Sequence, residues 1–297
     1  MIAQYVADGV VLGATLALGA IGLTLTYDIL RFANFAHGEF LTFGAYFALI
    51  FVGSFSGGAA LGPFTFGWNL LAAMVAALVL TVLLALLLDW VVWRPLRKSE
   101  VPIALVIASF GASLMLRNVV VFFWGSQPQY YTRSISIMRE VLPGVRMTAN
   151  QVLLVLLTIA LTIALHLFLS RTRLGRQMRA VSDNPSLAQV TGIDVRRVVR
   201  WVWIVGGGLA AIAGVMFGLT VQVSPQMGFT LILPLFAAAI LGGIGSVYGA
   251  VLGGLIIGLA ESLSVPLIGP AYKPAIAFLL MFLVLLVRPT GILGERS

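Results

Sequence analysis

The sequence contains no cysteine and few charged residues. Only 9% of its 297 residues are charged, whereas soluble domains average about 25%. Without cysteine the chain forms no disulfide and no thiolate metal site. His37 and His166 are its only histidines, and no spacing typical of metal ligands, of a catalytic nucleophile or of paired catalytic carboxylates occurs. The sequence therefore predicts no enzyme, no metal site and no cofactor held by this chain.

Apolar residues are abundant and come in long blocks. Sixty per cent of the residues are hydrophobic and the mean hydropathy is +1.07. The blocks are about 20 residues long, which is the length that carries a helix across a hydrocarbon core about 30 Å thick. Strands of a membrane barrel alternate apolar and polar residues, and the run from Leu70 to Leu88 does not. We predict an all-α integral membrane protein, a polytopic helical bundle that forms one transmembrane domain over residues 1–297.

Eight apolar stretches are candidates for membrane spans. They cover residues 8–28, 35–55, 68–92, 102–124, 151–170, 199–221, 229–265 and 272–288. The seventh is too long for one ordinary span and contains Gly242-Gly243-Ile244-Gly245-Ser246, which weakens a helix at its middle. We predict either one glycine-broken helix or two short helices here, so the bundle has 8–9 transmembrane segments.

Arginine and lysine indicate the orientation in the membrane, because loops rich in them stay in the cytoplasm. The segment of residues 171–200 holds seven of the 18 cations, so we place it in the cytoplasm. Counting back along the spans puts Arg94, Arg97 and Lys98 inside and the N-terminus outside. Counting forward, a cytoplasmic position for Arg288 and Arg296 requires the chain to cross the membrane nine times.

One loop conflicts with this topology. It covers residues 125–149, it falls outside, and it carries Arg133, Arg139 and Arg146. The net charge is +8. We assign it to cytoplasmic loops and to contact with anionic lipid heads, and not to binding of nucleic acid.

Small residues recur four positions apart on single helical faces. One set is Gly206, Ala210, Gly214 and Gly218, and another is Gly245, Gly249 and Gly253. This spacing lets two helix backbones approach closely in lipid. We predict close helix packing at these faces, with a sliding gate as the alternative.

Two groups of residues, one polar and one rich in glycine, are candidates for a substrate pathway. Asn34, His37 and Glu39 stand at the start of the second span, and ionisable groups at membrane depth normally face a protein interior or a water-filled cavity. Gly242, Gly243, Gly245 and Ser246 form the second candidate, because interrupted helices at that depth often line a cavity. The alternatives are a set of helix caps for the first cluster and a simple packing break for the second.

The basic loop of residues 171–200 contains the pattern of a short capped helix. Asn184 is placed as N-cap and Pro185 as the first helical residue, residues 186–190 supply one or two turns, and Gly192 ends them. A rigid helix that protrudes into the cytoplasm can transmit the motion of a motor protein. Contact of the loop with lipid heads is the alternative.

At these same residues the chain resembles the permease family of bacterial branched-chain amino acid ABC importers, and within it the first of the two permease types. The matching elements follow one another over nearly the whole length: Gly22-Leu-Thr-Leu, Arg31-Phe-Ala-Asn-Phe-Ala-His-Gly-Glu39, Arg94-Pro-Leu-Arg97, Gly175 through Gly192-Ile193, Ala239-Ile-Leu-Gly-Gly-Ile-Gly-Ser246 with Gly249, and Arg288-Pro-Thr-Gly-Ile-Leu-Gly294. Arg179-Ala180-Val181 stands where many other importer permeases have Glu-Ala-Ala, so contact details cannot be copied from those.

The resemblance implies a multi-pass subunit of the bacterial inner membrane with several partners. These are a second permease subunit, two cytoplasmic ATPase subunits that hold ATP and Mg, and a periplasmic substrate-binding protein. It also implies that the loop of residues 171–200 carries a coupling helix that docks on an ATPase subunit. The residues assigned to this docking are Asp183, Asn184, Pro185, Ser186, Leu187, Ala188, Thr191 and Gly192.

The expected function is import of leucine, isoleucine and valine by a non-catalytic membrane subunit. Three alternatives remain open from the sequence. The same kind of importer could carry urea, short amides or aromatic acids. A stand-alone secondary transporter could couple ions through Glu39 or Glu261. A membrane scaffold would conduct nothing.

Overall fold

The structure is a computed structural model that describes residues 2–54, 61–97, 101, 103–132, 136–288 and 290–294. Lys98, Arg133 and Arg296, which entered the orientation argument, lie outside the described residues, as does Pro289 of the C-terminal motif. The described chain is almost entirely helical, which confirms the predicted fold class.

The helices of the first half are α1 (Ile2–Leu30), α2 (His37–Ser54), α3 (Trp68–Leu88), the π-helix η1 (Asp89–Trp93), α4 (Arg94–Leu96) and α5 (Ile103–Trp124). A hairpin of β1 (Arg139–Leu142) and β2 (Val145–Met147) leads to α6 (Ala149–Arg171), α7 (Arg173–Asp183) and α8 (Pro185–Val190). The last part holds α9 (Val195–Thr220), α10 (Met227–Gly242), α11 (Val247–Ile268), the 3-10 helix η2 (Pro270–Tyr272) and α12 (Lys273–Val287).

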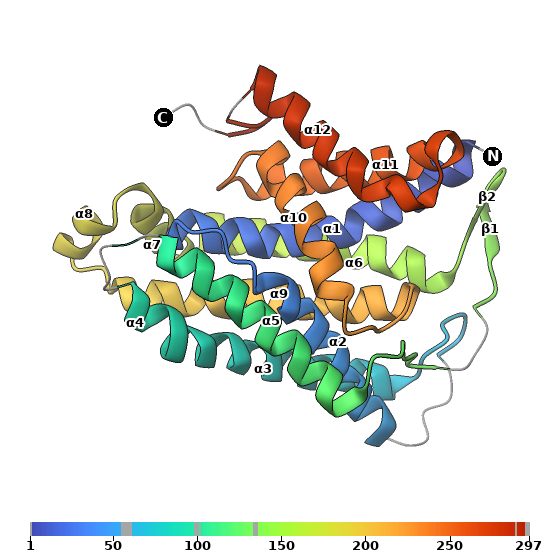
Figure 1. Ribbon diagram of the computed structural model, residues 1–297, viewed down its shortest axis with the longest axis horizontal. Coiled ribbons are helices and arrows are strands. Elements are labelled where there is room, and N and C mark those ends of the chain that lie inside the picture. The colour runs from blue at the N-terminus through green and yellow to red at the C-terminus, as the bar shows by residue number, and fades with distance from the viewer. Residues whose placement is uncertain are drawn as a thin grey trace.

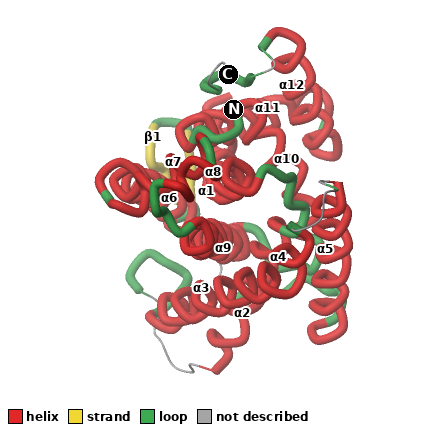
Figure 2. The backbone as a smooth tube through the Cα atoms, turned by 90° about the vertical axis from the view of Figure 1, so that its left-hand side faces the viewer, coloured by secondary structure: helices red, strands yellow, loops and turns green. Residues whose placement is uncertain are grey.

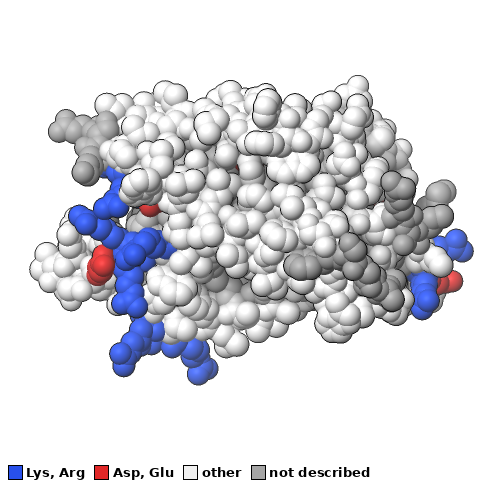
Figure 3. Space-filling model, turned by 90° about the horizontal axis from the view of Figure 1, so that it is seen from below, with Lys and Arg blue, Asp and Glu red and all other residues white. Residues whose placement is uncertain are grey.

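The two ends of the molecule differ in charge and in structure. Figure 1 shows α4, α7 and α8 at one end of the long axis and the β1–β2 hairpin at the other. Basic side chains gather mainly at one end (Figure 3), and all seven arginines of residues 171–200 are exposed there. We call the end with α7 and α8 the cytoplasmic end, because the distribution of arginine predicts this orientation.

Helix α1 connects the two ends and agrees with the predicted orientation. Near its start, the Gln4 amide donates to the Arg146 carbonyl of β2, and just past its end Arg31 donates to the Ser182 carbonyl of α7. The N-terminus and the basic loop therefore lie at opposite ends. Arg139 and Arg146 are exposed on the antiparallel β1–β2 hairpin, at the end of the molecule opposite α8 (Figure 1). We expect both arginines to lie outside the hydrocarbon region.

Seven helices in the described part of the chain are long and apolar enough to cross a membrane. Helix α2, with 18 residues, and α10, with 16 residues, fall outside that set. The long apolar stretch at residues 229–265 is two helices, α10 and α11, which pack against each other through Gly242 and Gly249. The count of eight or nine crossings stays a prediction.

The helix pair α1–α2 and the helix pair α9–α10 share one arrangement, but the chain runs through them in opposite directions. Helix α1 ends at Leu30 and α2 starts at His37, while α9 ends at Thr220 and α10 starts at Met227, 190 positions later in both cases. Helices α1 and α9 lie side by side in the centre of the bundle (Figure 2). In their most apolar windows 78% and 72% of the residues are buried, against 17% for α6, so the two long helices form the core.

Glycines allow the central helices to approach closely. A Cβ atom on Gly22 of α1 would lie 2.8 Å from the Gly206 carbonyl oxygen of α9, and one on Gly13 would lie 2.8 Å from the Leu255 Cα atom of α11. Gly214 is likewise in contact with the backbone of α2 at Leu41. The predicted close packing is confirmed for Gly206, Gly214, Gly249 and Gly253, because a side chain there would push the backbones apart. Gly245 instead lies in the turn before α11, not on a helical face.

Candidate functional site

Helices α2 and α10 begin inside the protein, where their first turns meet. The Nε2 atom of His37 lies 3.1 Å from the carbonyl oxygen of Gly19. Gly19 stands 11 residues before the cytoplasmic end of α1, which is about 16 Å at 1.5 Å per residue. The Gly228 amide of α10 donates to the Thr42 hydroxyl of α2 over 3.0 Å. We call this meeting point, formed by Gly38, Thr42 and Gly228, the α2–α10 junction.

Glycine is required on both sides of the junction. A Cβ atom on Gly38 would lie 3.0 Å from the Gly228 carbonyl carbon and closer still to its oxygen, and a Cβ atom on Gly228 would meet Gly38 in the same way. The obstacle is backbone in each case, which cannot rotate away as a side chain can. The two helix starts therefore touch backbone to backbone.

The segment of residues 31–36 brings the chain back from the cytoplasmic end to the junction. Arg31 reverses the chain direction with φ 57, which is the only positive φ of a non-glycine residue among those described. Ser109 of α5 accepts from the Phe35 amide over 3.1 Å and donates to the Ala33 carbonyl over 3.3 Å. These bonds satisfy backbone groups that find no water at membrane depth.

The predicted polar residues Asn34, His37 and Glu39 lie near the junction, but their side chains face different neighbours, since His37 meets Gly19 of α1 and Glu39 meets Ser113 of α5. All three are 0% exposed. One carboxylate oxygen of Glu39 accepts from the Ser113 hydroxyl over 3.1 Å. The other oxygen, the Nδ2 atom of Asn34 and the Nδ1 atom of His37 have no hydrogen-bond partner among the described residues. Buried polar atoms without partners are uncommon in proteins. Asn34 also accepts from the Ala36 amide over 3.1 Å, as a helix cap does, so the pathway interpretation and the cap alternative both stay predictions.

The second predicted cluster lies elsewhere. Gly242, Gly243, Gly245 and Ser246 form the turn from α10 into α11, at the cytoplasmic end. Gly243 and Gly245 have φ 105 and φ 92, a region that side chains disfavour, and Ser246 caps α11 by accepting from the Gly249 amide over 3.0 Å. The glycines therefore make a tight turn outside the mid-depth region, separate from Asn34, His37 and Glu39. Their part in a pathway stays a prediction.

The predicted short capped helix is present as α8. The Asn184 side chain accepts from the Leu187 amide over 2.9 Å, Pro185 is the first helical residue, and Gly192 with φ 87 follows the last turn. Helix α8 projects at the cytoplasmic end (Figure 1). Leu187 is 62% exposed and Val190, which the sequence reasoning did not select, is 85% exposed. Three positions apart, they form an apolar face outside the bundle.

A set of hydrogen bonds joins the segment before α8 to the end of α1. The Ser182 hydroxyl donates to the Asp28 carboxylate over 2.6 Å, and the Arg31 guanidinium donates to the Ser182 carbonyl oxygen over 2.6 Å. We call this set the α7–α1 link. Arg31 also starts the segment that leads to the junction, so these hydrogen bonds connect the end of α7 with the segment that precedes α2. The sequence contained no signal for it, because the partners are more than 150 positions apart.

An aromatic cluster packs at the first turn of α2. Trp93 of η1 and Trp203 of α9 stack with ring centroids 4.6 Å apart, and Phe40 of α2 stands edge-on to both. Trp93 is the last residue of the π-helix η1. An ion pair of 2.7 Å joins Asp89, the first residue of η1, to Arg97. Such aromatic pairs add about 1 kcal/mol each to the burial of their surface, so they hold α2 in position.

A charged residue that the sequence reasoning missed lies next to the junction. Arg117 stands in α5, and its guanidinium is 4.8 Å from the centroid of the Phe229 ring and 3.4 Å from the Gln226 side-chain oxygen. The signal was present in the sequence, because an arginine within an apolar run of this length is rare and commonly functional.

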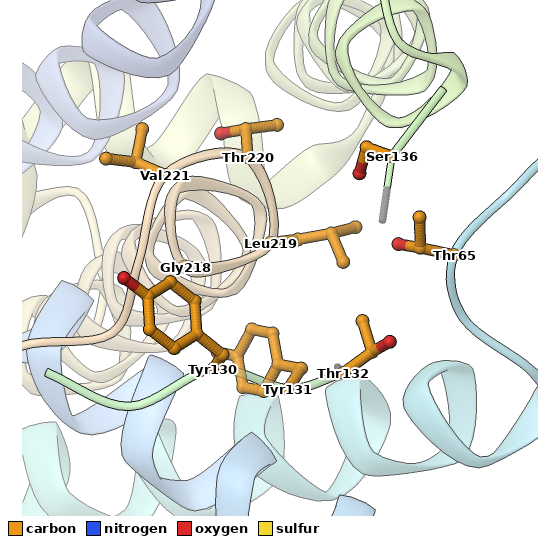
Figure 4. A pocket seen from close by; sticks show the side chains of 9 residues that line it. All are labelled: Thr65, Tyr130, Tyr131, Thr132, Ser136, Gly218, Leu219, Thr220 and Val221. Atoms are coloured by element: carbon orange, nitrogen blue, oxygen red, sulfur yellow. The ribbon is translucent and has the colours of Figure 1, made fainter. Parts of the chain in front are cut away.

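A cavity of about 140 Å³ opens near the outer end of α9. Figure 4 shows Leu219 projecting between Thr65, Thr132 and Ser136. The Tyr131 hydroxyl, on the same wall, donates to the Ala45 carbonyl of α2 over 2.9 Å. The full lining is Thr65, Tyr130, Tyr131, Thr132, Ser136, Gly218, Leu219, Thr220 and Val221. None of the predicted pathway residues is among them.

Comparison with known proteins matches nearly the whole chain. Residues 5–285 match the family described as branched-chain amino acid transport system, permease component. The chain is 36% identical over 297 residues to the high-affinity branched-chain amino acid transport system permease protein BraD of Pseudomonas aeruginosa, covering 98% of this chain and 95% of that protein.

Two further relatives carry the name LivH. The chain is 37% identical over 298 residues to LivH of Escherichia coli K12, with the same two coverages of 98% and 95%. It is 30% identical over 243 residues to a probable LivH of Methanocaldococcus jannaschii, which is 78% of this chain and 71% of that protein. No solved structure matches the chain.

Proposed function

Because the chain belongs to the family of branched-chain amino acid transport permeases, we propose that it is the membrane subunit through which an ATP-driven importer carries leucine, isoleucine and valine. One observation carries this proposal: the chain is 36% identical to BraD and 37% identical to LivH over 98% of its length. The structure adds a polytopic helical bundle with helix starts in its interior.

Permeases of this family work together with other subunits of a transport system. We place a second, related permease beside this chain, two ATPases with ATP and Mg on its cytoplasmic end, and a periplasmic binding protein at its outer end. In this assembly the chain lies in the inner membrane and catalyses no reaction itself. No sequence pattern typical of nucleotide binding occurs in it, since the glycine run ending in Ser246 has no lysine after it.

The junction has the composition that a branched-chain amino acid needs. Such a substrate is a zwitterion with an apolar side chain, so its route has to be mostly apolar with a few polar groups that offset the lost hydration. Asn34, His37 and Glu39 supply polar atoms among buried apolar residues. The first turns of α2 and α10 add the partial positive charge of helix N-termini. Contact of Gly38 with Gly228 closes the route, and separation of α2 from α10 opens it.

Helix α8 is the element on which an ATPase subunit acts. Its exposed Leu187 and Val190 provide an apolar face at the cytoplasmic end, where no lipid covers it. ATP binding closes the ATPase pair and displaces α8. The displacement passes through Ser182 to Asp28 and Arg31, and from Arg31 through residues 31–36 to the junction.

Reconstitution of the complete importer tests this proposal. Proteoliposomes that contain the permease pair and the ATPases should take up leucine when ATP and the binding protein are supplied, with no ion gradient across the membrane. Uptake by this chain alone, or uptake driven by a proton gradient, would show a secondary transporter instead. Uptake of urea, an amide or an aromatic acid in place of leucine would refute the branched-chain cargo.

The apolar face of α8 leads to a specific prediction. Leu187→Ser combined with Val190→Ser should lower the affinity of the permease for the ATPase subunit roughly 100-fold or more, because each buried aliphatic side chain contributes about 2 kcal/mol. Co-purification of the ATPase with the tagged permease, and uptake per permease, measure the effect.

Gln189→Ser serves as the matched control, since Gln189 is an exposed residue of the same helix. It should change ATPase binding by less than twofold. Equal loss in the control and the double variant would mean that the helix as a whole was disturbed. Full ATPase binding by the double variant would exclude this face as the docking surface.

A further inference from the structure

Arg117 is a cation at membrane depth. It stands seven residues before the end of α5 at Trp124, about 10 Å along the helix, within a segment of mean hydropathy 1.9. Its half-buried side chain lies against Gln226 and Phe229 at the start of α10, and both of these residues are exposed. A charged group in such a place costs several kcal/mol unless something in the protein or a ligand compensates it.

The protein itself supplies little compensation. No carboxylate among the described residues lies within ion-pair distance of Arg117. The Gln226 oxygen, 3.4 Å away, accepts one of the five N–H bonds of the guanidinium, and the Phe229 ring faces its carbon. Most of its donor capacity is therefore open to a ligand.

The surroundings of Arg117 favour an anion. Gln226 is the N-cap of α10, its side chain makes no capping bond, and no acidic residue stands in the first turn of the helix. The N-terminus of a helix carries a partial positive charge, which adds to the guanidinium charge. A guanidinium binds a carboxylate through two parallel hydrogen bonds.

An acidic residue contacts α5 one helical turn away. Ser113, four positions before Arg117 on α5, donates to one oxygen of Glu39. The second oxygen of Glu39 is buried with no hydrogen-bond partner among the described residues. Glu39 therefore contacts α5 one helical turn, about 5.4 Å along the axis, from the position of Arg117.

We propose that Arg117 binds the carboxylate of the transported amino acid beside the α2–α10 junction, while Glu39 faces its ammonium group. The site accepts any α-amino acid backbone and leaves the choice of side chain to the apolar walls and to the binding protein. This inference rests on the proposed function, because it names how that function's cargo is held.

The absence of cysteine from the natural sequence permits a direct test of the charge. In the reconstituted importer, with partner subunits that also lack cysteine, Arg117→Cys should lower leucine uptake about tenfold or more, since a charge-assisted pair contributes about 1.5–3 kcal/mol. Reaction with 2-aminoethyl methanethiosulfonate, which attaches a cation, should restore at least half of the uptake. Methyl methanethiosulfonate, which attaches a neutral group, should restore none. Excess leucine should slow both reactions.

Asn118→Cys is the control, because Asn118 is the next residue, is exposed and bonds only within α5. Its uptake should stay within twofold of the unmodified protein. Equal recovery with the neutral reagent, or uptake by Arg117→Cys within twofold, would assign Arg117 a packing role and overturn the inference.

If Arg117→Cys does not assemble, Arg117→Lys and Arg117→Gln decide the question. Lysine should transport at least fivefold faster than glutamine, and equal rates would overturn the inference. Failure of the unsubstituted importer to take up leucine would instead refute the proposed function. The two failures are therefore distinct.

Discussion

Gly38→Val is expected to abolish uptake and to destabilise the protein by about 3 kcal/mol or more. A side chain at this position would overlap the backbone of α10 at Gly228, and overpacking against backbone exceeds the 1–3 kcal/mol typical of a core. Gly228→Val should act alike, because the contact is reciprocal. Thermal unfolding of the detergent-solubilised protein measures the stability, and leucine uptake by the reconstituted importer measures the function.

Gly53→Val is the control for this prediction, because Gly53 belongs to the same helix α2 and a Cβ atom there would meet nothing within 4 Å. Its stability and uptake should remain close to those of the unsubstituted protein. A Gly38→Val protein that unfolds at the unchanged temperature and transports leucine would mean that α2 and α10 do not touch as described.

Arg31→Ala is expected to uncouple ATP hydrolysis from transport. The substitution removes the guanidinium that donates to the Ser182 carbonyl oxygen, and with it one of the two side-chain contacts of the α7–α1 link. The movement of α8 then reaches the segment of residues 31–36 less completely. Uptake should fall about tenfold while ATP hydrolysis by the assembled importer stays within twofold, measured side by side on the same proteoliposomes.

Arg31→Gly separates the hydrogen bond from the backbone strain. Arg31 has φ 57, which costs a residue with a side chain about 1 kcal/mol and costs glycine nothing. The glycine variant should therefore be about 1 kcal/mol more stable than the alanine variant and equally uncoupled. Normal coupling in either variant would show that the motor reaches the junction by another route.

Local features of the sequence were sufficient for the overall architecture and for α8. The apolar blocks predicted the helical membrane fold, and the positions of Asn184, Pro185 and Gly192 predicted a short capped helix that the structure contains. Both depend on interactions within a few residues, namely the burial of a helix in lipid and the hydrogen bonds at its ends. The polar atoms of Asn34, His37 and Glu39 were also identified, because a polar group at membrane depth is visible in a single sequence.

Other features depended on which helices are neighbours. The sequence left open whether the Gly242–Ser246 run is a broken helix or a connection, and the fold shows a tight turn from α10 into α11. Arg117 was not selected from the sequence, and its position beside Gln226 and Phe229 follows from the packing of α5.

The sequence by itself determined that this protein is a bundle of membrane helices with a basic loop and a short capped helix within it, because these follow from contacts between near neighbours in the chain. Only the tertiary structure decided that α2 and α10 start at mid-depth and meet, that Ser182 bonds to Asp28 and Arg31, and that α5 brings Arg117 to the junction. These contacts join residues 74 to 190 positions apart. Because the membrane helices are similar in composition, a single sequence does not show which of them pack against each other.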